Sequence, residues 1–93
     1  METKNNSYAG FIMIPMRNII TTRLTPTEKL VLFYICADMS VSGYSRIQDS
    51  ETSKTLSIPL DEVKKIYRKL IVEEFISVED HNGIDYFTYG NNY

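Results

Sequence analysis

Basic side chains within one short stretch are the residues of this chain whose type and spacing best suit a chemical task. The stretch between positions 59 and 74 of the 93-residue sequence contains Lys64, Lys65, Arg68 and Lys69. Lysine and arginine neutralise the phosphates of DNA, and their long side chains can reach the edges of bases. The same stretch also carries four acidic residues, so a solvated helix face of mixed charge is the competing interpretation.

Groups that could catalyse a reaction or hold a metal are scarce. The sequence has one histidine, His81, and one cysteine, Cys36. A structural or catalytic zinc site needs a set of such ligands at defined spacing. Cys36 lies in an apolar run without a nearby base to activate it, and the four glycines form no phosphate-binding loop. We therefore expect no enzyme activity, no metal and no cofactor.

Length and composition limit the kinds of protein that the chain can be. Ninety-three residues are enough for one domain with a modest core. The formal net charge of −2 argues against a protein that coats DNA through its overall charge, but not against one basic face. A single cysteine allows no internal disulfide, and no apolar run approaches the roughly 18 residues of a membrane span. We therefore expect a cytoplasmic protein without a membrane partner.

The first element that must position the basic stretch is a central helix. Thr25 can cap a helix, Pro26 suits its first position, and Glu28 lies where a capping box requires an acid. The residues at 30–39 are apolar on nearly all sides, which predicts a helix surrounded by the core. Gly43 is expected to end this region.

Two further helices are predicted around a sharp turn. Asp49 or Ser50 could cap a short helix through Leu56, although the residues of this helix favour caps over helix interiors. Ser-Ile-Pro at 57–59 forms the turn, and a long amphipathic helix follows over 59–74. Apolar residues at helical spacing form the inward stripe of the long helix: Val63, Ile66, Tyr67, Leu70 and Ile71. The basic residues therefore fall largely on the other face.

A hairpin is predicted after the long helix. Residues 76–78 and, more loosely, 84–89 alternate between apolar and polar side chains, which is typical of strands. Asn-Gly at 82–83 supplies the positive φ angles of a type I′ turn. A two-residue loop also fixes which residues should face each other across the ladder: Val78 and Phe87, and Ile76 and Tyr89.

The order of these elements predicts an α+β domain of the winged helix-turn-helix class, with three main helices, a hairpin wing and an apolar N-terminal arm. Such domains usually present one helix to the DNA major groove. Acidic residues near the tip of the hairpin weaken this interpretation: Glu79, Asp80 and Asp85. Phosphates would repel them, so either the wing points away from DNA or its surface meets another protein.

The ends of the chain are predicted to differ from its centre. Residues 1–10 should form a flexible tail, 11–90 the domain, and 91–93 a frayed end. The apolar segment 11–16 is interrupted by Pro15, which favours an edge strand or an extended arm. It could pair with a partner chain or pack against the wing as a third strand. The residues expected to mediate self-association are Phe11, Ile12, Met13, Ile14 and Tyr8.

Residues 11–89 resemble the N-terminal winged-helix module of DnaD-like replication proteins and of phage and plasmid replication initiators. The matching features are the arm ending in Ile14-Pro15, the Leu-Thr-Pro-Thr-Glu start at 24–28, the Leu-Ser-Ile turn at 56–58, and the exit through Phe75 and Ile76 into an acidic Asn-Gly hairpin. The resemblance implies a part in starting DNA replication, by binding origin DNA or by recruiting primosome proteins. It also implies self-association through the arm.

Together these observations predict a replication-associated module that binds double-stranded DNA through helix 59–74. Arg46 and Lys54, which precede this helix, are expected to add contacts to the DNA backbone. Two alternatives remain: a scaffold domain of a primosome or replisome organiser with little DNA binding, or a small phage or plasmid transcriptional regulator. The expected partners are double-stranded DNA, further copies of the chain as a dimer or larger oligomer, and replication proteins.

Overall fold

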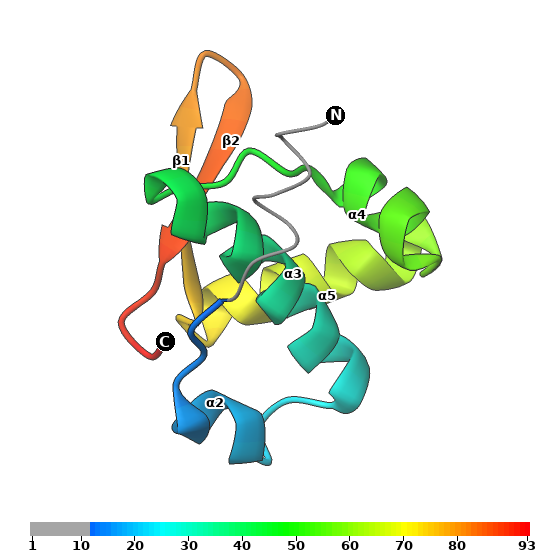
Figure 1. Ribbon diagram of the computed structural model, residues 1–93. Helices are drawn as coiled ribbons and strands as arrows, with labels where there is room; N and C mark the ends of the chain where they lie inside the picture. The colour runs from blue at the N-terminus through cyan, green and yellow to red at the C-terminus, as the bar shows by residue number, and fades with distance from the viewer. Residues whose placement is uncertain (1–11) are drawn as a thin grey trace, which may run out of the picture.

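The computed structural model describes residues 12–93 and has an α+β architecture, with four helices and a two-stranded antiparallel hairpin in that range (Figure 1). The hairpin projects from one end of the molecule, and the first short helix lies at the other. This order is compatible with a winged helix-turn-helix. The elements are α2 (Met16–Ile20), α3 (Pro26–Ser42), α4 (Asp49–Leu56), α5 (Leu60–Val72), β1 (Ile76–His81) and β2 (Ile84–Tyr89).

Helix α3 begins and ends as the sequence predicts. The Thr25 hydroxyl accepts a hydrogen bond from the Glu28 N–H, and Glu28 Oε1 accepts one from the Thr25 N–H at 2.8 Å, so the capping box is confirmed. Gly43 ends the helix in the left-handed region with φ of 89°, where glycine meets little steric penalty. The most deeply buried side chains of α3 are Val31, Leu32, Ile35 and Met39, which confirms its central place in the core.

Helix α5 packs its apolar stripe against α3 and α4. Val63, Ile66, Tyr67 and Leu70 are buried, and the partly buried Ile71 packs against them, so the predicted inward stripe is confirmed. The helix is shorter than the predicted range of 59–74. It starts after the N-cap Pro59, and the backbone leaves the helical region at Glu74, where φ is 63°.

Helix α4 is held by a buried side-chain contact more than by its own sequence. The predicted caps Asp49 and Ser50 are wrong, because the N-cap position is taken by Gln48, whose side chain makes no capping bond. The fully buried Thr52 hydroxyl instead lies 2.6 Å from the Tyr67 hydroxyl of α5. The Tyr67 hydroxyl also donates to the Ile47 carbonyl at 3.0 Å, which fixes α4 against α5.

The hairpin has the predicted register and turn. Asn82 and Gly83 have φ of 56° and 84°, which are the positive values that a type I′ turn requires. The predicted cross-strand pairs, Ile76 with Tyr89 and Val78 with Phe87, are both present. The other edge of β2 is occupied at one point by the segment before α4, because Ser45 and Phe87 exchange two backbone hydrogen bonds at 2.8 and 2.9 Å.

The N-terminal arm differs from the prediction. Among the described residues, 12–15 form no strand, so neither an edge strand nor a third strand beside the wing is observed there. Pro15 is the N-cap of α2, and Met16 already belongs to this helix. The segment that bridges to β2 is the one around Ser45 instead. The candidate residues Tyr8 and Phe11 lie outside the described residues.

The C-terminal residues, expected to fray, contact the end of α5. The Asn92 N–H donates to the Glu74 carbonyl at 2.8 Å, and Arg17 of α2 donates to the Tyr93 carbonyl. Gly90 passes so close to this turn that an added Cβ would lie 2.1 Å from the Glu74 carbonyl oxygen. Within residues 12–93, no helix combines the length and apolar character needed to cross a membrane.

Candidate nucleic-acid interface

The outward face of α5 carries three exposed basic side chains, Lys64, Lys65 and Arg68. They are outside the apolar stripe that packs into the core, so the sequence-predicted division of the helix into two faces is present. Lys64 Nζ lies 3.8 Å from a carboxylate oxygen of Asp49 in α4, at the solvent-exposed edge of the helix pair. In the described part of the chain, no carboxylate lies within 4 Å of the charged groups of Lys65 and Arg68.

Lys69 has different surroundings from the other three. Its Nζ lies 2.8 Å from Glu28 Oε1, and this pair connects α5 to the start of α3. Burial by itself would raise the pKa of Glu28, but the hydrogen bonds from Lys69 and from the Thr25 N–H outweigh it and lower the pKa. Lys69 therefore has a structural ion pair, which leaves Lys65 and Arg68 as the freer charges on this helix.

The two remaining predicted contact residues lie on separate elements. Lys54 is exposed in the last turn of α4, beside the turn that leads into α5. Arg46 lies in the segment between α3 and α4, and its guanidinium is 5.8 Å from the ring centroid of Tyr86 in β2. The structure thus places Lys54 with the helix pair and Arg46 beside the wing.

The tip of the wing is acidic, as the sequence indicates. Asp80 and Asp85 are directly opposite each other across the hairpin, and like charges in such a pair repel. One oxygen of Asp80 accepts the Gly83 N–H at 2.9 Å, which supports the turn. His81 Nε2 lies 3.0 Å from an exposed Glu79 carboxylate oxygen. This end of the molecule would be repelled by a phosphate backbone.

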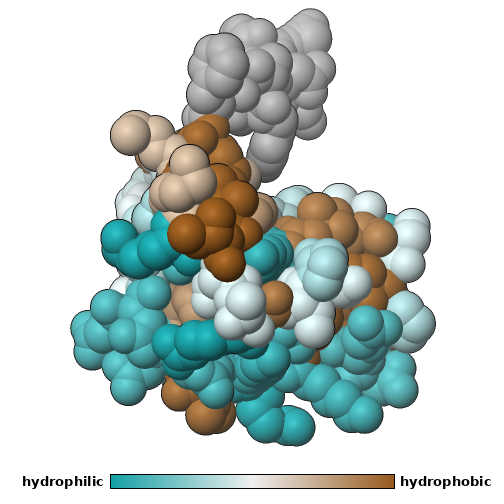
Figure 2. Space-filling view, turned by 90° about the horizontal axis from the view of Figure 1, so that it is seen from below, coloured by the Kyte–Doolittle hydropathy of each residue, from teal (hydrophilic) through white to brown (hydrophobic). Residues whose placement is uncertain are grey.

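An apolar surface surrounds α2 at the opposite end of the molecule. Ile12 and Met13 are exposed, and Met13 retains 93% of its accessible surface, whereas Ile14 is half-buried. The view from below shows one group of apolar side chains next to the grey residues and another at one edge, with hydrophilic side chains over much of the rest of this side (Figure 2). Three further exposed members of this surface were not among the residues predicted to mediate self-association: Met16, Ile19 and Ile20.

The cysteine has the surroundings of a core residue. Cys36 is 2% exposed, and burial raises its pKa to about 11. A thiol with that pKa is almost entirely protonated at neutral pH, so it is a poor nucleophile. Among the described residues, no group of three potential ligands is arranged to hold a metal ion.

Comparisons with protein-family models, with curated proteins and with solved structures found no match to this chain. Its function is therefore inferred from its own residues and from the positions that the fold gives them. The feature with the clearest chemistry is the exposed basic face of α5.

Proposed function

We propose that this chain is a winged helix-turn-helix module that binds double-stranded DNA through the outward face of α5. The observation that carries the proposal is the placement of Lys64, Lys65 and Arg68 on the exposed side of a helix whose other side is buried. A helix of this kind can enter the major groove and contact both phosphates and base edges. The resemblance to DnaD-like proteins supports a role in DNA replication.

The contact between α4 and α5 supports the same proposal. The buried hydrogen bond between Thr52 and Tyr67 fixes the angle at which α5 leaves the turn. A fixed angle lowers the entropic cost of aligning several side chains with one DNA surface. Lys54, exposed in α4, can then contact the phosphates that flank the groove. We propose no DNA contact for the acidic tip of the wing.

Fluorescence anisotropy of a labelled duplex across a salt series tests the proposal. Phosphate contacts release condensed cations, so affinity should fall steeply as salt rises. We expect Lys65→Ala with Arg68→Ala to weaken binding roughly tenfold or more, since each lost contact costs about 1 kcal/mol or more.

A matched control for this experiment is Arg17→Ala with Lys29→Ala. It removes the same charge from α2 and from the start of α3, where the two side chains donate to the Tyr93 and Ile19 carbonyls. Circular dichroism and urea denaturation should first show that this variant keeps the wild-type fold. Equal losses in the two double variants would show that only net charge matters. The absence of duplex binding at low salt would contradict DNA binding altogether.

A second candidate function is that of a protein-interaction or oligomerisation scaffold in a primosome or replisome organiser. The facing pair Asp80 and Asp85 favours it, because a wing of this charge does not suit DNA. We expect light scattering to give a mass of two or more chains if the apolar surface around α2 is an interface. Met16→Ser with Ile20→Ser should then reduce the mass to one chain, since both side chains are exposed and their loss spares the core.

The control for the oligomer experiment is Leu30→Ser with Val41→Ser. These two residues are exposed on α3 rather than on α2, so the mass should not change. A wild-type mass of one chain at high concentration would contradict self-association. Duplex binding by such a single chain would leave DNA binding as the supported function.

A further inference from the structure

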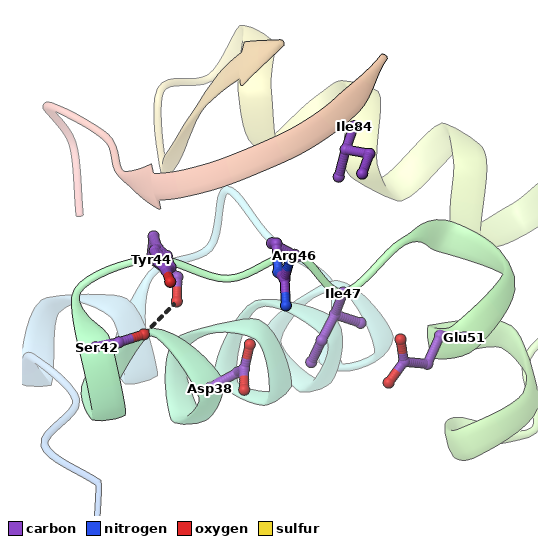
Figure 3. Close-up of a pocket in the computed structure, with 7 residues that line it drawn as sticks. All are labelled: Asp38, Ser42, Tyr44, Arg46, Ile47, Glu51 and Ile84. Carbon is purple, nitrogen blue, oxygen red and sulfur yellow. Dashed lines mark hydrogen bonds between the residues drawn. The ribbon is translucent and has the colours of Figure 1, made fainter. Parts of the chain in front are cut away.

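A cleft of about 480 Å³ lies between α3, the segment that follows it, the start of α4 and the wing. Figure 3 shows the carboxylates of Asp38 and Glu51 pointing into this cleft from α3 and α4, one on each side of the Ile47 side chain. Ile84 reaches toward the same space from β2. The cleft is therefore lined mainly by polar residues, with two isoleucines, Ile47 and Ile84, and a carboxylate at either side of Ile47.

Neither carboxylate forms an ion pair with another residue of the described chain. Among residues 12–93, no basic side-chain nitrogen lies within 4 Å of the carboxylate oxygens of Asp38 or Glu51. Arg46 also lines the cleft, and Figure 3 shows its side chain reaching toward the side where Asp38 lies. Its guanidinium carbon is 5.8 Å from the centroid of the Tyr86 ring. The charged residues of the lining are thus two acids and one base, so the cleft keeps a net negative charge and two unpaired carboxylates for a positively charged group from outside.

The sheet face beside the cleft is suited to contact with another chain. Ser45 pairs with Phe87, so its neighbours Tyr44 and Arg46 lie on the same side of the sheet as Tyr86. The rings of Tyr44 and Tyr86 have centroids 5.2 Å apart, and Tyr44 is exposed. Tyrosine and arginine are enriched among the residues that dominate protein interfaces.

We propose that this cleft binds a lysine or arginine side chain from an extended segment of a partner protein. The aliphatic part of that side chain would lie on Ile47 and Ile84, and its cationic end would bind Asp38 and Glu51. Neighbouring residues of the segment would cross the Tyr44–Tyr86 face. The acidic tip of the wing attracts the same kind of partner, because it adds negative charge at this end of the molecule.

The charges favour a basic protein segment over a single-stranded nucleic acid. Aromatic rings beside an arginine could stack on bases. Two free carboxylates in the cleft and the acids of the wing tip would, however, repel the sugar-phosphate backbone. This site is also separate from Lys65 and Arg68 on α5. Its binding of a basic segment can therefore be tested independently of DNA binding.

Chemical-shift mapping with the isotope-labelled full chain tests the inference, with a synthetic peptide of alternating lysine and threonine as the probe. We expect saturable shifts at the amides of Asp38, Ile47, Glu51 and Ile84. The double variant Asp38→Asn with Glu51→Gln should weaken binding roughly tenfold or more, because the charge-assisted hydrogen bonds are lost. Both residues are at least partly exposed, so the variant should keep the wild-type spectrum elsewhere.

The matched control is Asp61→Asn with Glu62→Gln, which removes the same charge from the first turn of α5. It should leave peptide affinity unchanged, and a peptide of alternating glutamate and threonine should not bind. Equal weakening of peptide binding by the two double variants would overturn the proposed site in the cleft, because it would show that the peptide is attracted by net charge alone. Tighter binding of oligo-dT than of the lysine peptide at Tyr44 and Tyr86 would overturn the choice of partner.

A second variant tests the apolar part of the cleft. Ile84 is exposed, so Ile84→Ser should leave the fold intact. It should weaken binding of the lysine peptide several-fold, because the aliphatic part of the bound lysine side chain loses its contact with Ile84. Unchanged affinity in this variant would overturn the proposed position of the basic side chain on Ile47 and Ile84.

Discussion

The outward face of α5 and the tip of the wing carry opposite charge, although only three residues separate the helix from β1. Lys64, Lys65 and Arg68 make one surface basic, whereas Asp80 and Asp85 face each other on the other. The net charge of −2 conceals this separation. The comparison shows that charge is divided between elements, so the electrostatic potential near each surface follows the placement of charge and not its sum.

The largest expected effect concerns the buried contact between α4 and α5, which positions the basic face of α5. Tyr67→Phe removes the hydroxyl that bonds to the Thr52 hydroxyl and to the Ile47 carbonyl, all of which are buried. We expect the free energy of unfolding to fall by about 1–3 kcal/mol, because buried polar groups lose their partner. Urea denaturation followed by circular dichroism measures this change.

Tyr34→Phe provides the control for Tyr67. Tyr34 lies half-buried on α3, and within residues 12–93 its hydroxyl makes no hydrogen bond. The expected change is below about 0.5 kcal/mol. Equal destabilisation by the two variants would contradict a special role for the contact between α4 and α5.

Much of the fold could be predicted because it depends on short-range signals. The capping box at Thr25, the apolar stripe of α5 and the Asn-Gly turn each involve residues close together in the sequence. The position of α4 depends instead on Thr52 meeting Tyr67, fifteen residues away. No local pattern in a polar helix indicates such a contact.

The candidate site was predicted less completely for the same reason. The basic residues of α5 could be placed on one face by helical spacing alone. That Lys69 pairs with Glu28 depends on a contact across 41 residues, and that Arg46 lies beside Tyr86 depends on the bridge at Ser45. The cleft was not foreseen, because its lining comes from four separate segments.

Neutralising the wing should reduce the contrast between the two surfaces. Glu79→Gln with Asp85→Asn removes two negative charges from the hairpin, so repulsion of nearby phosphates should weaken. We expect duplex affinity to rise roughly threefold to tenfold at low salt, and the gain to disappear at high salt. The control Thr22→Lys with Leu30→Lys makes the same change in charge at exposed positions near the start of α3, away from the hairpin (Figure 1). An equal gain in the control would show that the wing does not lie near DNA.

The smallest expected effect concerns the ion pair between Lys69 and Glu28, which distinguishes Lys69 from the other basic residues of α5. The lowered pKa of Glu28 means that its pair with Lys69 stabilises the fold above the ordinary carboxyl pKa. This contribution is lost as the pH falls through the pKa of the folded state. Glu28→Gln should therefore cost about 1 kcal/mol or less at neutral pH and nothing in acid.

Thermal unfolding at neutral and acidic pH measures the effect of Glu28→Gln, with Glu62→Gln as the control. Glu62 is exposed in the first turn of α5, and within the described residues it has no ion pair. Glu62→Gln should therefore have little effect on how the unfolding temperature depends on pH. A Glu28→Gln deficit that persists unchanged in acid would contradict a role for the ionised pair.

The edge of β1 that is not paired with β2 gives the acidic side chains of the wing a second effect. Within residues 12–93, β1 pairs only with β2, and the far edge of β2 is bridged at Ser45, so β1 presents unpaired backbone groups to solvent. Such an edge is a template on which other copies can add strands and aggregate. The charged side chains of Glu79 and Asp80 in β1 oppose this addition of strands. We therefore expect the acidic side chains of the wing to hinder strand addition at this edge and so to slow the growth of fibrils in concentrated protein.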